Sequence, residues 1–97
     1  MKEEIFGPVL PIISYQSIDE AINKHILKKG KPLAIYFFGN IFNNQNYKDI
    51  LEKTSSGNVT SNDILSQTVA IDLGFGGVGG SGMGRYGGYE GFKNWSN

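Results

Sequence analysis

The sequence predicts an α/β fold, because strand and helix patterns alternate along its first 61 residues. Apolar runs without alternation, at residues 9–15 and 33–38, are typical of strands covered on both faces, as in parallel sheets. Segments with apolar residues at helical spacing follow each run. The order strand, helix, strand, helix, strand predicts right-handed parallel crossovers. A glycine-rich loop is expected to complete the chain.

The first strand and helix are expected between residues 9 and 30. Residues 9–15 read VLPIISY, with Pro11 at a bulge or an unpaired position. Ser17 and Glu20 form an S-x-x-E capping box, in which each side chain satisfies an orphan backbone donor, so the helix begins at Ser17. Gly30 ends it. One helix face carries the apolar residues Ile18, Ala21, Ile22 and Ile26.

Residues 33–38, LAIYFF, predict the second strand. A second helix follows, in which Tyr47, Ile50, Leu51 and Thr54 recur at helical spacing. A third, short strand is expected at residues 57–61.

Glycine occupies ten of the eighteen positions from 74 to 91, which predicts a loop, since each glycine costs backbone entropy in a helix or strand. Gly77, Gly79 and Gly82 fit the G-x-G-x-x-G fingerprint of a dinucleotide-binding turn. That turn needs a helix directly after it and an acidic residue about 20 positions on. Neither pattern follows, so the fingerprint is interpreted as a chance match.

Composition excludes several classes of function. The formal net charge is zero, so no electrostatic attraction to nucleic acid or to an anionic membrane is expected. No cysteine is present, which removes disulfides, thiolate metal sites and thiol nucleophiles. No apolar run approaches the roughly 20 residues of a membrane span. We expect an intracellular, cytoplasmic protein without a metal site.

Several motifs, in order along nearly the whole chain, resemble the aldehyde dehydrogenase family. They are EEIFGPVLPI, SIDEAI, KPLAIYFF, TSSGNVTSND and GFGGVGGSGMGRYGGYEGF. The resemblance is closest to the class 3, or fatty aldehyde dehydrogenase, branch. It implies the C-terminal portion of an enzyme that oxidises aldehydes to carboxylic acids with NAD or NADP. Residues 1–73 would be part of the catalytic domain, and residues 74–97 a glycine-rich loop and C-terminal segment.

The same resemblance assigns site residues. Glu4 matches the family carboxylate that binds the hydroxyls of the nicotinamide ribose, and Phe6 matches the aromatic residue beside the nicotinamide. A carboxylate suits a vicinal diol because it accepts two charge-assisted hydrogen bonds. The positions that match the wall of the aldehyde tunnel are Leu65, Thr68, Val69 and Phe75.

Three positions depart from the family pattern. Gly74 stands where proline is usual, Gly80 where asparagine is common, and Gly87 where several relatives carry histidine. Each change is expected to loosen the loop or to remove a polar group. Substrate preference is therefore not inherited from the resemblance.

The family attacks the aldehyde with a cysteine thiolate, so no residue of this chain is assigned as catalytic, and the chain alone is expected to be inactive. The resemblance predicts a piece of a longer gene product. One alternative is a free-standing, inactive remnant that self-associates or docks on intact family members. Another is an RNA-binding tail in which Tyr86, Tyr89 and Phe92 stack on bases. The RNA-binding alternative has little support, because only Arg85 and Lys93 supply positive charge in this tail.

Overall fold

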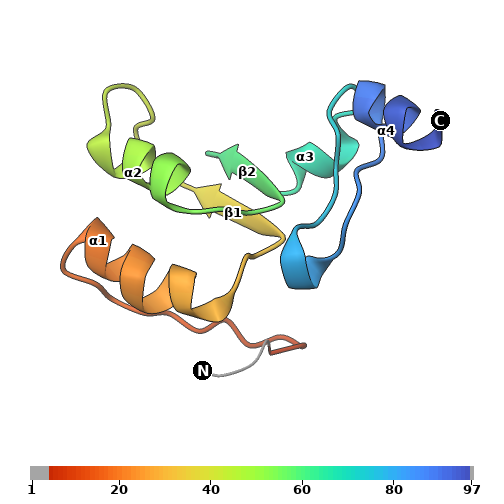
Figure 1. Ribbon diagram of the computed structural model, residues 1–97. Helices are drawn as coiled ribbons and strands as arrows, with labels where there is room; N and C mark the ends of the chain where they lie inside the picture. Colours follow the sequence, from red (N-terminus) through yellow and green to blue (C-terminus); the bar gives the residue numbers. More distant parts are fainter. Residues whose placement is uncertain (1–4, 97) are drawn as a thin grey trace.

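The computed structural model describes residues 5–96. The first helix, α1 (Ile18–Ala21), continues through a π-helical turn (Ile22–Ile26) and a 3₁₀ turn (Leu27–Lys29). The elements that follow are β1 (Ala34–Phe37), α2 (Gln45–Lys53), β2 (Asn58–Ser61), α3 (Ser66–Val69), a 3₁₀ turn (Gly79–Ser81) and α4 (Gly88–Trp95). Figure 1 shows their arrangement.

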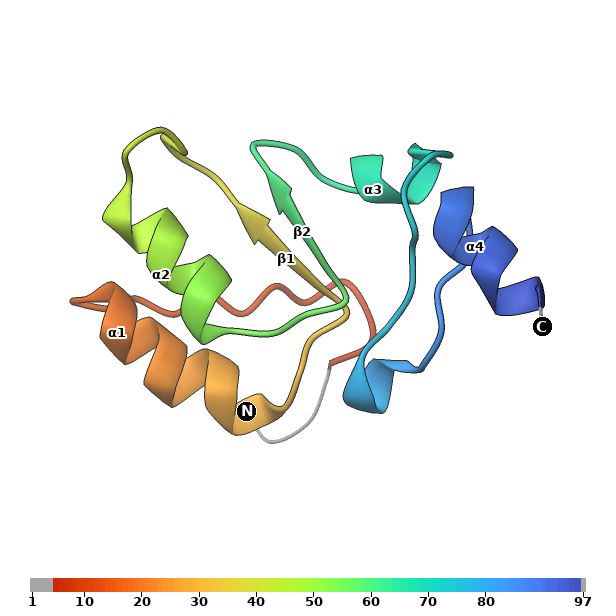
Figure 2. The same cartoon turned by 45° about the horizontal axis from the view of Figure 1, so that its top comes forward.

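The two strands form a parallel sheet, as predicted for the second and third strands. Ala34 pairs with Asn58, and the register continues to Phe37 opposite Ser61. The α1 and α2 helices lie side by side on one side of the strands (Figures 1 and 2). The expectation that the second strand is covered on both faces is wrong for this chain, because Tyr36 is 37% exposed and the flanking Phe38 is 64% exposed.

The capping residues of the first helix act as predicted, with one shift. The Glu20 amide donates to Ser17 Oγ at 3.2 Å. The return bond comes from the Gln16 amide, which donates to the Glu20 carboxylate at 3.0 Å, rather than from the Ser17 amide. Ile22 is almost fully buried, and Gly30, at φ 82°, ends the helical segment.

In the core, α2 packs against the two strands. Ile50 is buried. The rings of Phe37 and Tyr47 lie 4.9 Å apart between centroids, and Ser61 Oγ donates to Tyr47 Oη at 2.9 Å. Aromatic packing and a hydrogen bond therefore join α2 to both strands.

An ion pair also joins α1 to α2. The Lys53 ammonium group lies 2.8 Å from the Asp19 carboxylate and 2.9 Å from that of Asp49. These bonds, the one to Asp19 first, raise the pKa of Lys53 to about 12.

The predicted strand at residues 9–15 is wrong: this segment has no strand pairing in the structure. Pro8 and Pro11 lack the amide hydrogen that a strand ladder needs. The described residues offer the segment no neighbouring strand, so its side chains are open, with Leu10 83% and Ile12 88% exposed.

The expectation that residues 74–91 form only a loop is also wrong, because α4 begins at Gly88. A Cβ atom at Gly88 would overlap the Asp72 carbonyl oxygen, and one at Gly91 would lie 3.3 Å from the Tyr86 backbone. Glycine permits this close approach of the helix to the preceding chain, which offsets its entropic cost.

Candidate functional site

One wall of the candidate site is the short α3 helix. Leu65 precedes it in the left-handed conformation, at φ 62°. The Thr68 hydroxyl donates to the Leu65 carbonyl oxygen at 2.6 Å and is therefore engaged by the backbone. Leu65 and Val69, on either side of Thr68, are 59% and 76% exposed.

The facing wall comes from the glycine-rich segment, where Phe75 and Tyr86 form an antiparallel bridge. Each amide donates to the other residue's carbonyl oxygen, at 2.8 and 2.9 Å. The two rings meet edge to face, with centroids 5.5 Å apart. Arg85 Nη2 donates to the Gly57 carbonyl oxygen at 3.0 Å and ties this segment to the start of β2. The segment is thus a packed element.

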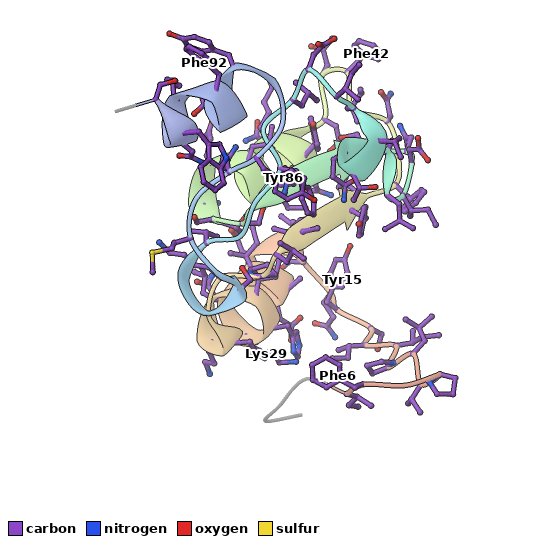
Figure 3. The ribbon with its side chains drawn as sticks, turned by 90° about the vertical axis from the view of Figure 1, so that its right-hand side faces the viewer. Phe6, Tyr15, Lys29, Phe42, Tyr86 and Phe92 are labelled. Carbon is purple, nitrogen blue, oxygen red and sulfur yellow. The ribbon has the colours of Figure 1, made fainter. Side chains whose placement is uncertain are left out.

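A cavity of about 280 Å³ lies between these walls. Phe75 and Tyr86 also border a second, more open cavity of about 500 Å³, which reaches Met83 and Trp95. In the view of Figure 3, the label of Tyr86 stands near the centre of the molecule. The smaller cavity is lined by Gln67, Thr68, Ala70, Ile71, Leu73, Phe75, Tyr86 and Gly87.

The structure brings together two of the predicted tunnel residues, Thr68 and Phe75, at the smaller cavity. Leu65, the N-cap of α3, and Val69, its last residue, do not line that cavity. Phe6 is 88% exposed and lies near the lower edge of the molecule in the view of Figure 3, away from Tyr86. Glu4 lies outside the described residues.

Sequence reasoning assigned no site role to Gln67 or Gly87 and considered Tyr86 only as a base-stacking residue. The signal available for Tyr86 was its aromatic neighbour across the glycines, Phe75, because such pairs stabilise antiparallel contacts. No comparable local signal identifies Gln67. A polar side chain in a short turn is normally predicted to be exposed to solvent, whereas Gln67 is only 8% exposed.

Of the residues that the structure describes, no charged one lines this cavity. A hydrogen bond from Lys24 lowers the pKa of Glu20, and a hydrogen bond from Gln45 lowers that of Asp49. These groups and Lys53 belong to α1 and α2 and do not line the cavity. Among residues 5–96, no group of acidic, histidine or cysteine side chains could hold a metal ion. The chemistry of the cavity is therefore that of a mostly apolar binding wall.

Across the same described stretch, no helix is long and apolar enough to cross a membrane.

The parallel crossover between β1 and β2, with α1 and α2 beside the strands, defines this chain as part of an α/β domain. All 97 residues match the aldehyde dehydrogenase family, and the chain belongs to that family.

Individual relatives support this assignment and the predicted class 3 branch. The chain is 51% identical over 79 residues to aldehyde dehydrogenase family 3 member A2 of Mus musculus, covering 81% of this chain and 16% of the relative. It is 50% identical over 97 residues to the dimeric NADP-preferring aldehyde dehydrogenase of Mus musculus, covering 100% of this chain and 21% of the relative. The chain thus spans about a fifth of the length of these relatives.

A solved structure agrees with the fold. The substrate-bound state of AldH from Staphylococcus aureus superimposes with a TM-score of 0.84 at 44% sequence identity. The match covers 97% of this chain and 20% of that chain. The predicted α/β class, as part of an aldehyde dehydrogenase domain, is confirmed.

Proposed function

We propose that this chain supplies part of the active site for oxidation of an aldehyde to a carboxylic acid with NAD or NADP. One observation carries the proposal. Thr68 and Phe75, each assigned to the aldehyde tunnel by family resemblance alone, line a single cavity of about 280 Å³. The family match over all 97 residues gives this cavity its context.

On the aldehyde side, this chain provides an apolar wall. Phe75 is held by its backbone bridge and its edge-to-face contact with Tyr86, so it presents a rigid surface. The Thr68 hydroxyl donates its hydrogen to the Leu65 carbonyl oxygen, so it has no hydrogen left to donate to an aldehyde oxygen. Leu65 and Val69 lie next to this wall and are exposed, although they do not line the cavity itself. Such a surface suits the hydrocarbon part of an aldehyde, whose transfer from water is favourable.

On the cofactor side, Phe6 fits its assigned role, because its ring is 88% exposed and free to pack on a planar group. The Glu4 carboxylate would accept hydrogen bonds from the ribose diol. The bound nicotinamide would take up the hydride. Glu4 and Phe6 would act by orienting it, since correct positioning lowers the barrier to reaction. The thiolate nucleophile of the family is not among these 97 residues, which contain no cysteine.

The test is a chimaera in which this chain replaces the matching 97 residues of the dimeric NADP-preferring mouse enzyme. We expect aldehyde-dependent reduction of the cofactor. Glu4→Gln should weaken cofactor positioning by about 1–3 kcal/mol, because an amide replaces one charged acceptor by a donor. Phe75→Ala should raise the KM for the aldehyde.

Phe92→Ala is the matched control, because Phe92 is an exposed phenylalanine on α4 that lines neither cavity. Equal effects of the two alanine variants on the aldehyde KM would remove Phe75 from the tunnel. Unchanged cofactor affinity and turnover in Glu4→Gln would remove Glu4 from the cofactor site.

The alternative of an RNA-binding tail receives no support from the tail's cations. Arg85 donates to a backbone carbonyl. Lys93 lies 2.7 Å from the Glu90 carboxylate and over the ring of Tyr89. Both cations are thus engaged within the chain, whereas phosphate contacts dominate RNA affinity.

The alternative of a module that docks on intact family members is favoured by the exposed apolar side chains of the N-terminal segment. Sedimentation of the 97-residue chain mixed with the mouse enzyme tests it. Co-sedimentation that depends on both proteins would support docking.

A further inference from the structure

Gln67 is the single polar or charged residue that is buried within the described residues, at 8% exposure. Both polar atoms of its side-chain amide are hydrogen-bonded. Its Nε2 donates to Tyr36 Oη at 2.7 Å, and its Oε1 accepts from Thr60 Oγ1 at 2.8 Å. These two bonds use one N–H and one oxygen lone pair of the amide and hold it toward the strands.

The two partners of Gln67 are neighbours in the sheet. Tyr36 of β1 and Thr60 of β2 stand opposite each other in the parallel register. One amide from α3 therefore spans both strands at a single level of the sheet. A shift of α3 along either strand would break at least one of these bonds.

The α3 helix depends on such an anchor, because it has only four residues and its N-cap makes no side-chain hydrogen bond. A single helical turn is unstable alone, since nucleation fixes several dihedral angles for one hydrogen bond. Thr68, the next residue, lines the cavity that Phe75 closes on its other side. The position of α3 thus sets the width of the cavity.

We infer that Gln67 is a positioning residue, which fixes the aldehyde wall to the sheet through Tyr36 and Thr60 and thereby sets the fit of the substrate. This inference rests on the proposed function, because it requires the cavity to receive the aldehyde. Gln67 acts through Thr68 and its neighbours and is not itself a catalytic residue.

The first test is Gln67→Leu in the chimaera described above. This change removes both bonds at similar side-chain size. We expect the KM for the aldehyde to rise roughly tenfold, as two hydrogen bonds of ordinary net strength would allow, while kcat and the KM for the cofactor stay unchanged. Amide hydrogen exchange at Thr68 and Ala70 should become faster. Gln67→Glu should restore most of the aldehyde KM, because a carboxyl group accepts from both hydroxyls.

Gln45→Leu is the matched control. It also removes a glutamine hydrogen bond, to Asp49 at 2.6 Å, but on α2. Its aldehyde KM should not change. If Gln67→Leu alters only thermal stability, as Gln45→Leu would, or leaves the aldehyde KM unchanged, the inference is overturned. If Gln67→Leu does not fold, Thr60→Val decides, since it removes one of the two bonds at constant size. It should raise the aldehyde KM about threefold, and no rise overturns the inference.

Thr68→Phe separates this inference from the proposed function. This variant narrows the cavity directly and should lower kcat/KM for bulky aldehydes. If Thr68→Phe has no effect, the cavity is not the aldehyde site, and the proposed function fails together with the inference that rests on it. If Thr68→Phe acts as expected and Gln67→Leu does not, only the positioning role of Gln67 is overturned.

Discussion

Replacement of Gly76 by alanine should open the wall that carries Phe75. A Cβ atom at Gly76 would overlap the Gly84 carbonyl oxygen and would lie 3.0 Å from the Arg85 Cα atom. Both neighbours are backbone, so relief requires the two chain segments to separate. Separation breaks the two backbone hydrogen bonds between Phe75 and Tyr86, worth about 0.5–1.5 kcal/mol each. It also breaks their aromatic contact, worth a similar amount. We therefore expect local stability to fall by about 2–4 kcal/mol.

Hydrogen exchange of the Phe75 and Tyr86 amides in the chimaera measures this loss directly, because opening of the bridge exposes both groups. Gly80→Ala is the control, since a Cβ atom there meets no atom within 4 Å and Gly80 has no positive φ. Alanine at Gly80 should be neutral, or stabilising by about 0.4–1 kcal/mol. Equal exchange rates in the two variants would refute the view that this segment is packed rather than loose.

Three further predictions concern the helices and the activity. Ser17→Ala should lower stability by about 1 kcal/mol in chemical unfolding, because the Glu20 amide loses its acceptor, whereas Ser55→Ala should not. The ion pairs raise the pKa of Lys53 from 10.5 to about 12. The stability that they give the folded chain should therefore be fully present below pH 10.5 and should be lost as the pH rises through about 12. Unfolding followed against pH should show this alkaline loss in the parent and not in Lys53→Met. The 97-residue chain alone, given NAD or NADP and a panel of aldehydes, should form no reduced cofactor above a boiled control, because it has no thiol nucleophile. Cofactor reduction that is lost on mutating Glu4 would contradict this expectation.

Much of the fold between residues 17 and 61 could be predicted from local chemistry. The capping pair at Ser17 and Glu20 locates the first helix, and the apolar run at 33–38 locates β1. These signals depend on neighbours in sequence, so no tertiary information is needed to interpret them. The run at residues 9–15 carries an equally strong apolar signal, yet it forms no strand. Strand formation needs a partner, which an apolar pattern cannot supply.

The C-terminal glycines were misjudged for the opposite reason. Glycine lowers the propensity of a segment to form a helix or strand. In this structure, however, several glycines allow distant segments of the chain to come into close contact. The space that a Cβ atom would take at Gly74 lies 2.9 Å from Glu90 side-chain atoms, so glycine there accommodates α4. At Gly87, the positive φ of 84° and the nearby Leu73 carbonyl oxygen disfavour a larger residue. Of the three positions that depart from the family pattern, Gly80 alone has open space around it.

The candidate site likewise contains residues that could be predicted from the sequence and one that could not. Family resemblance identified Thr68 and Phe75, which meet at the cavity. It did not point to Gln67, because the positioning role that we propose for Gln67 depends on the register that sets Tyr36 opposite Thr60. That juxtaposition joins residues far apart in sequence, and no pattern along the chain encodes it.

The exposed apolar surface leads to a last prediction, that the 97-residue chain associates when it is alone. Ile22 and Ile50 are the buried apolar side chains among the described residues, whereas Phe6, Leu10 and Ile12 are each more than 80% exposed. The radius of gyration, 14.9 Å, exceeds the roughly 13 Å of a compact domain of about this length, so the chain covers its apolar groups poorly. Burial of such groups against a second copy would be favourable. Sedimentation velocity should show oligomers that grow with concentration, and serine at positions 6, 10 and 12 together should reduce them. A monomer that unfolds in one sharp, cooperative calorimetric transition would contradict this reasoning, because it would require a core that two buried isoleucines cannot supply.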